Sequence, residues 1–331
     1  MQAILTVTIP FFALELLGYL AAQRRWMPES AIPGLNAYVL YYALPCMLFR
    51  FGSSMPFARL IDPLLIALYT TCALLMIAIT IGVTWRRRSG PAGVDLKDAA
   101  FGALVAAFPN AGFMGVPLLV ALLGDGAAGP VIGAILVDLI LTSTLCLALA
   151  QASGHRSVGD RSMLAAAVLS LRGALTNPLP WAIVTGALFA AFDRELPGPI
   201  AQIVRMLGDS AAPVALFTIG AVLSRAGRHG HSRTPIRNYL PVAGLKLLVH
   251  PALVFGIGAG AAALGAPVSR FGLMVLTLVA ALPSASNVSV LAERYGADNG
   301  RVTRIIMAST VLAFASFSTL AWLFGVGAAA N

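Results

Sequence analysis

Charged residues are scarce in this sequence, and their scarcity excludes a soluble protein. Only 11% of the 331 residues are Asp, Glu, Lys or Arg, while 59% are hydrophobic and the mean hydropathy is +0.86. A soluble domain needs more polar surface than this, and a disordered chain needs more charge. The composition therefore predicts an all-α integral membrane protein embedded in a lipid bilayer.

The chain also has few cysteines, and it lacks the motifs of common enzymes. Cys46, Cys72 and Cys146 lie inside apolar segments at spacings that fit neither a disulfide framework nor a zinc site, so we interpret them as small core residues. The sequence contains no nucleophile triad, dinucleotide-binding fingerprint or Walker phosphate loop. We expect no enzymatic activity, no cofactor and no metal site.

Long apolar segments are abundant, and each is long enough to cross a membrane. A spanning helix needs about 20 mainly apolar residues. Met1 and Gln2 place no positive charge before the first segment, so we expect this helix to be retained rather than cleaved as a signal peptide. Ten transmembrane helices are predicted, at 3–22, 34–51, 61–84, 98–123, 129–151, 174–192, 199–224, 238–264, 270–294 and 303–325.

The formal net charge of +9 could indicate a nucleic-acid partner, but the positions of the basic residues exclude one. Most of them lie in the connections after the odd-numbered helices, whereas the opposite connections hold only Arg50, Arg59, Arg194 and Arg270. Positive-inside bias then places those odd connections in the cytoplasm and both termini outside. The basic residues on the cytoplasmic side are Arg24, Arg25, Arg86, Arg87, Arg88, Lys97, Arg156, Arg161, Arg172, Arg225, Arg228, Arg233, Arg237, Arg294, Arg301 and Arg304.

One near-repeat interrupts two of these helices. The stretch 106–112 (AAFPNAG) recurs as 280–286 (AALPSAS), each inside an apolar segment. A proline in a helix interior frees backbone polar groups, which survive in a membrane only where protein or a watery cavity meets them. Secondary transporters use such discontinuous helices at their binding sites. Pro109 and Pro283 are therefore predicted helix breaks at a transport site.

Weaker echoes extend the repeat over both halves of the chain. The stretch 44–49 resembles 212–217, and 142–145 resembles 317–320. The polar connection 152–173 separates a first half, 1–151, from a second half, 174–331. Because five helices per half is an odd number, the second half enters the membrane from the other side. The fold prediction is two inverted five-helix repeats.

The motif 108–117 (FPNAGFMGVP), together with 36–49 and 281–290, resembles the auxin efflux carrier family of bacterial and plant transporters. This resemblance covers nearly the whole chain. It implies a fold related to the bile acid:sodium symporters, in which the broken fourth and ninth helices cross. It also implies a scaffold domain of helices 1, 2, 6 and 7, a transport domain of helices 3–5 and 8–10, and a homodimer formed through the scaffold.

The residues after the first break offer polar groups to a substrate. The amide of Asn110 suits a carboxylate or a freed carbonyl, and Gly112 and Gly115 are expected to allow close backbone approach. The resemblance implies that Asn110 lies at the substrate crossover. The alternative is that its side chain only satisfies backbone groups that Pro109 frees.

The second break is followed by small polar side chains. Ser284, Ser286 and Asn287 are candidate substrate ligands, although serines also serve helix packing in membranes. We expect Asn287 to complete the crossover site with Asn110. Because neither break contains Arg or Lys, anion binding would rely on amide donors and on the N-terminal dipoles of the half-helices.

Several charges are predicted inside the membrane, where each is a functional hypothesis by default. Lys246 and His250 are four residues apart and share a helix face. Our hypothesis is that Asp138, alone or with Lys246, senses a proton or cation and couples it to transport; the alternative is a fixed structural ion pair. Arg205 and Asp209, also four apart, are expected to form a local salt bridge. Glu15 would face the cavity or bond an adjacent helix.

By resemblance, the cargo is a small organic acid anion such as malonate or malate, and the Ala and Gly content points to a bacterial inner-membrane protein. The predicted function is a secondary active carrier that works by alternating access at the crossover, with proton coupling favoured. Sodium-coupled symport is an alternative, although no acid adjoins either break. A second alternative is a membrane sensor that binds a ligand without moving it. The acid, the transport direction, the coupling ion and the oligomeric state stay open.

Overall fold

The computed structural model describes residues 2–54, 61–85, 93–152, 168, 176–229 and 234–326. These residues form helices and contain no strand. Most of the predicted 152–173 connection lies outside the described residues. The same is true of Arg59, Arg86, Arg87, Arg88, Arg156, Arg161, Arg172 and Arg233 from the charge pattern, and of the Arg228 side chain.

The first half contains α-helices interrupted by short π-helical or 3₁₀ turns, which carry η labels. In chain order they are α1 (Gln2–Gln23), α2 (Ala31–Tyr38), η1 (Val39–Ala43), α3 (Leu44–Ser54), α5 (Pro63–Trp85), α6 (Leu96–Ala107), η2 (Ala111–Gly115), α7 (Val116–Leu123), η3 (Asp125–Ala127), α8 (Ala128–Val137), η4 (Asp138–Thr142) and α9 (Ser143–Ala152). The second half has α11 (Pro178–Ala191), α12 (Gly198–His229), α13 (Ile236–Gly244), η5 (Leu245–Val249), α14 (His250–Ala263), α15 (Arg270–Ala280), α16 (Asn287–Arg294) and α17 (Asn299–Leu323).

Among the described residues, seven helical stretches are long and apolar enough to span a membrane. Three shorter apolar helices, Ala111–Leu123, Pro178–Ala191 and Arg270–Ala280, lie in the remaining three predicted segments. The chain is therefore a multi-pass membrane protein. The count of ten crossings and the inverted repeat stay predictions.

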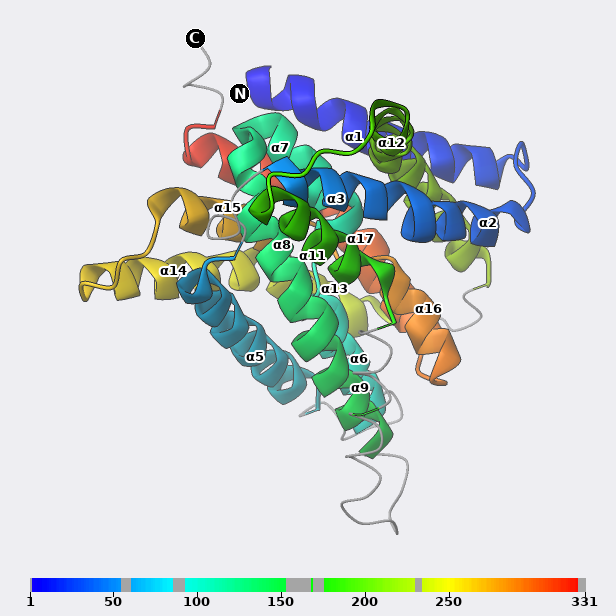
Figure 1. Ribbon diagram of the computed structural model, residues 1–331. Coiled ribbons are helices and arrows are strands. Elements are labelled where there is room, and N and C mark those ends of the chain that lie inside the picture. Colours follow the sequence, from blue (N-terminus) through cyan, green and yellow to red (C-terminus); the bar gives the residue numbers. More distant parts are fainter. Residues whose placement is uncertain are drawn as a thin grey trace.

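One group of helices packs through glycines. This set, here called the α12 group, comprises α1, α2, α3, α11 and α12, in which α1 packs on α12 and α3 packs on both α11 and α12. A Cβ atom at Gly18 would overlap the Phe217 carbonyl, and one at Gly220 would overlap the Glu15 carbonyl. Such close backbone approach is typical of helix packing in membranes. Figure 1 shows α1, α2, α3 and α12 gathered along one side of the bundle.

A second set, here called the α6 group, comprises α5 to α9 and α13 to α17. In it α5 and α9 pack on α6, α14 packs on α15, and α13 packs on α17. Helices α5, α6 and α9 lie on the side of the bundle away from α1 and α12 in Figure 1. The two groups meet where α12 and α1 contact α17.

A buried arginine ties the ends of three helices in the α6 group. Arg301, only 2% exposed, donates to the Asn238 carbonyl at 2.9 Å and to the Asp98 carbonyl at 2.7 Å. Gly102 leaves room for its guanidinium, because a Cβ atom there would lie 3.0 Å from both terminal nitrogens. The charge pattern predicted a topogenic role for Arg301. Its contacts add a structural one, since they join α6, α13 and α17.

The expected Arg205–Asp209 salt bridge is wrong. The Asp209 carboxylate pairs with Arg50 of α3 at 2.5 Å. The spacing of four residues did place Arg205 and Asp209 on one face of α12. However, that face packs against α3, whose arginine supplies the partner across the helix contact.

Candidate functional site

The two helix breaks satisfy each other's backbone. Helix α6 ends at Ala107 and α15 ends at Ala280, and Pro109 and Ser284 then pair as an isolated antiparallel bridge. The Asn110 N–H donates to the Pro283 carbonyl at 2.8 Å, and the Ala285 N–H donates to the Phe108 carbonyl at 3.0 Å. Polar backbone in the middle of an apolar bundle thus finds its partners in the other break.

The Asn110 side chain is left without a hydrogen-bond partner by this arrangement. Asn110 is 2% exposed, and within the described part of the chain its carboxamide oxygen has no partner. Its backbone carbonyl accepts from the N–H groups of Met114 and Gly115, at 3.1 and 3.0 Å. The unpartnered atom is an acceptor, so it does not serve the backbone carbonyls that Pro109 frees.

The two glycines after this break differ in their surroundings. A Cβ atom at Gly115 would lie 2.8 Å from Leu282 Cδ1, so a side chain there would crowd the facing break. A Cβ atom at Gly112 would meet nothing within 4 Å, so the close approach expected at Gly112 is not found. Gly112 borders open space because it lines a cavity.

The polar residues of the second break divide into packing and cavity positions. The Ser284 N–H donates to Ser309 Oγ at 3.2 Å, while the buried Ser284 hydroxyl has no partner in the described residues. Ser289 Oγ donates to the Ser286 carbonyl at 2.9 Å, which is local helix packing. Asn287 is exposed and, with Ser286, lines the same cavity as Asn110.

This crossover cavity has a volume of about 660 Å³, within the range of small-molecule sites. It lies between the two helix groups, since residues of α2, η1 and α11 line it opposite the two breaks. Of the predicted site residues it is lined by Pro109, Asn110, Gly112, Asp138, Ser286 and Asn287. The others, Gly115, Pro283, Ser284, Lys246 and His250, do not line it.

A second cavity has a volume of about 500 Å³. It is lined by the opposite ends of helical stretches that also line the crossover cavity. It is lined by Ser54 at the end of α3, whereas the crossover cavity is lined by Asn36 in α2 at the other end of that stretch. On α8 the two cavities meet closely, because Ala134 lines the second and the adjacent Ile135 lines the first. Helix α8 therefore borders both cavities, the second along its first part and the crossover cavity from Ile135 onward.

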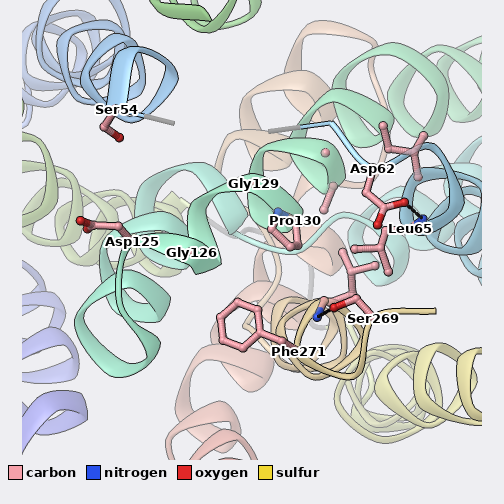
Figure 2. A pocket seen from close by; sticks show the side chains of 14 residues that line it. Ser54, Asp62, Leu65, Asp125, Gly126, Gly129, Pro130, Ser269 and Phe271 are labelled. Atoms are coloured by element: carbon pink, nitrogen blue, oxygen red, sulfur yellow. Dashed lines mark hydrogen bonds between the residues drawn. The ribbon is translucent and has the colours of Figure 1, made fainter. Parts of the chain in front are cut away.

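Two carboxylates line the second cavity, and they lie apart from one another (Figure 2). Asp62 Oδ1 accepts from the N–H groups of Leu64 and Leu65, at 2.9 and 3.2 Å, and so begins α5. Figure 2 shows Asp125 on the opposite side of this cavity from Asp62, with the two side chains not pointing toward one another. The described residues contain no group of three His, Cys, Asp or Glu that could hold a metal ion.

Asp138 is the one acid among the described residues that line the crossover cavity, and hydroxyl groups bind both of its oxygens. Asp138 is 1% exposed and begins the π-helical turn η4. Its Oδ2 accepts from the Tyr69 hydroxyl at 3.0 Å, and its Oδ1 accepts from Thr142 at 3.1 Å. π-Helical turns inside α-helices occur frequently at functional sites. Tyr69 could not be found from the sequence, because one tyrosine in an apolar helix looks like a core residue.

Lys246 binds the end of the broken helix rather than Asp138. Its Nζ donates to the Ala280 carbonyl at 2.7 Å and lies 3.2 Å from His250 Nδ1. Ala280 is the last residue of α15, so the ammonium group satisfies a free carbonyl at the negative end of that half-helix. The fixed Asp138–Lys246 ion pair is not found among the described residues. The ring of Tyr69, which binds Asp138, lies 5.9 Å from the ring of His250, which lies next to Lys246. Tyr69 and His250 therefore lie between Asp138 and Lys246.

Glu15 takes neither of its two expected roles. It is 5% exposed in α1, it lines neither cavity, and both of its carboxylate oxygens lack a hydrogen-bond partner among the described residues. The close α1–α12 contact, in which the backbone at Glu15 meets Gly220, encloses it without supplying a donor.

The comparisons with known proteins agree with one another. A family profile described as "Membrane transport protein" matches residues 3–323. The chain is 30% identical to "Putative malonate transporter" of Rhizobium meliloti (strain 1021), over 99% of this chain and 98% of that protein. It is 23% identical to "Uncharacterized transporter YfdV" of Escherichia coli (strain K12), over 96% and 95% of the two chains. It is 21% identical to "Auxin efflux carrier component 8" of Arabidopsis thaliana, over 67% and 72%.

Proposed function

The chain belongs to the membrane transport protein family, whose matched relatives are named as transporters and carriers rather than enzymes, and from this premise we propose that it is a secondary active carrier for a small organic acid anion such as malonate or malate. The observation that carries the proposal is the backbone bridge between Pro109 and Ser284 at a cavity of about 660 Å³. Two broken helices that meet at a cavity are the arrangement by which secondary transporters build their binding sites.

A substrate carboxylate would bind between Asn110 and Asn287. Both residues line the crossover cavity, and each carboxamide supplies N–H donors. Each also precedes or begins a half-helix, whose first N–H groups attract negative charge. Gly112 leaves space beside them, because no atom lies within 4 Å of the position a Cβ atom would take.

Alternating access would follow from the two cavities. The α6 group acts as the transport domain and moves against the α12 group as the scaffold, so that the substrate faces each cavity in turn. Helix α8 borders both cavities, since Ala134 lines the second and Ile135 lines the first. Positive-inside bias assigns the end that holds Arg294 to the cytoplasm, so the crossover cavity opens inward and both termini are periplasmic. A bacterial inner membrane and a homodimer through the scaffold belong to the same proposal.

Proton coupling would involve the cluster of Asp138, Tyr69, Lys246 and His250. Asp138 lines the cavity, while Lys246 holds the Ala280 carbonyl beside the second break. A change of charge at Asp138 would alter the hydrogen bond from Tyr69, which packs on His250. The charge of Asp138 would thereby affect the contact between Lys246 and the end of the broken helix α15. Sodium coupling is the alternative, in which the oxygens of Asp138 and Thr142 would bind the cation.

Uptake of radiolabelled malonate, malate and an indole acid into proteoliposomes, with imposed proton or sodium gradients, tests the carrier. We expect saturable uptake that Asn110→Ala abolishes and that Asn299→Ala, which changes an asparagine outside both cavities, leaves intact. The gradient that drives uptake names the coupling ion. Equal uptake by wild type and Asn110→Ala would contradict a crossover site. A folded protein that binds an acid without moving it would favour the sensor.

A further inference from the structure

One face of α16 lines the crossover cavity along its whole length. Asn287, Val290, Leu291 and Arg294 all border the cavity, and their spacing of three, four and seven residues places them on one helix face. The face is polar at both ends and apolar in the middle. The sequence pattern had this spacing, but Arg294 was interpreted only as one of the basic residues that orient the chain.

Arg294 differs from its neighbouring arginines in having no partner in the described residues. Arg301 and Arg304 donate to backbone carbonyls of Asn238 and Thr234. Arg294 is exposed, and within the described part of the chain it makes no hydrogen bond or ion pair. Its position in the last turn of α16 suits the helix dipole, but the dipole does not require a side chain that lines a cavity. The guanidinium is therefore free to bind a ligand.

The geometry of an α-helix directs this arginine toward the crossover. Side chains on a helix lean toward its N-terminus, so Arg294 leans back along the cavity toward Asn287. Seven residues at 1.5 Å per residue separate their backbones by about 10 Å. An extended arginine side chain covers much of that length. Its planar fork offers the cavity two N–H donors that match a carboxylate.

We infer that Arg294 binds the second carboxylate of a dicarboxylate whose first carboxylate occupies the Asn110–Asn287 site. This inference rests on the proposed function and names the residue that selects dicarboxylates for that site. The amide site alone carries no positive charge, so a doubly charged acid would otherwise stay uncompensated in a partly dry cavity. Short aliphatic dicarboxylates are selected over monocarboxylates of the same length. Because Arg294 and Asn287 belong to one helix, both ends of the substrate stay bound as α16 moves.

The test compares malonate with propionate, which has the same carbon chain and one carboxylate fewer. Affinities are measured by isothermal titration on purified protein in detergent, and uptake is measured in proteoliposomes. Wild type is expected to favour malonate by about 10- to 100-fold, the size of a charge-assisted hydrogen-bonded pair. Arg294→Gln should remove this preference, because it weakens the binding of malonate and leaves the binding of propionate unchanged. Arg294→Lys keeps part of it, because the ammonium group is charged but not forked.

Arg24→Gln is the matched control, since Arg24 is a basic residue of the same predicted side that does not line the cavity. It should leave the ratio of the two affinities unchanged. The inference is overturned if Arg294→Gln weakens both acids equally, or neither, while wild type still takes up malonate. If folded wild type takes up and binds neither acid, the proposed function fails first, and the inference fails with it.

Discussion

At the scale of single residues, the buried charges are held by their neighbours rather than by each other. Asp138 is bound by two hydroxyl groups, and Lys246 is bound by the carbonyl at the end of α15. A charge inside a membrane bundle is costly, and it is retained where it has a function or a partner. Both residues have partners that are neutral, so either charge could change without leaving the other as one half of a broken ion pair.

We expect Asp138→Asn to uncouple uptake from the proton gradient. The amide keeps the size of the side chain and can still accept from Tyr69, so folding should be preserved while the ionisable group is lost. Uptake in proteoliposomes should then fall to the rate measured without a gradient, and it should lose its pH dependence. Asp125→Asn, which changes an acid of the second cavity, should keep both. An unchanged rate and pH profile in Asp138→Asn would remove Asp138 from the coupling mechanism.

The sequence could predict which residues break the helices but not which residues bind the buried charges. Pro109 and Pro283 act locally, because the missing N–H group and the ring disturb their own helix. The partners of Lys246 and Asp209 belong to other helices. A spacing of four residues reports a shared face but not what packs against it, which is why the expected Arg205–Asp209 pair was wrong and the Lys246–Ala280 contact was missed.

At the scale of helices, each of the two groups is held by contacts of its own. The α12 group relies on glycines that bring backbones together, as at Gly18 and Gly220. In the α6 group, the crossed breaks are joined by backbone hydrogen bonds, and the Arg301 contacts join three helix ends. Contacts within each group would let each move as a unit, which suits the proposed scaffold and transport domains.

Gly220→Ala should destabilise the protein, because the added methyl group would overlap the Glu15 carbonyl and push α1 from α12. Overpacking of this kind costs about 1–3 kcal/mol. Gly82→Ala in α5 is the matched control, since a Cβ atom there meets nothing within 4 Å and alanine favours the helix. Thermal unfolding in detergent should show a lower midpoint for Gly220→Ala and an equal or higher one for Gly82→Ala. Equal midpoints for Gly220→Ala and wild type would mean that the α1–α12 contact is looser than described.

At the scale of the whole molecule, the two cavities are lined by different ends of the helix bundle. The apolar segments and the repeated proline motif were enough to predict a membrane protein whose breaks form a site, because both depend on local composition. The cavities were not predictable, since they form where the two helix groups fail to fill the space between them. That space depends on packing between helices distant in sequence, such as α2 and α16.

Reciprocal labelling of the two cavities tests whether they alternate. Val290→Cys lines the crossover cavity, and Gly126→Cys lines the second, where a Cβ atom would lie 3.5 Å from the nearest Phe271 atom and fits without strain. The partly exposed Cys46 is replaced by Ser in both variants, whereas Cys72 and Cys146 are buried. Each variant is treated in vesicles with a thiol reagent that cannot cross the membrane. We expect Val290→Cys to react from the cytoplasmic side and Gly126→Cys from the periplasmic side.

Malonate should then change the two labelling rates in opposite directions, because a carrier that closes one path must open the other. Leu264→Cys is the reference, since Leu264 is 91% exposed and lies outside both cavities, and its rate should not respond to substrate. A sensor that binds without moving its ligand would protect only Val290→Cys. Rates that rise or fall together while transport continues would contradict alternating access, because the two cavities would then form one continuous path. Opposite changes would instead require the α6 group to move against the α12 group around the Pro109–Ser284 bridge.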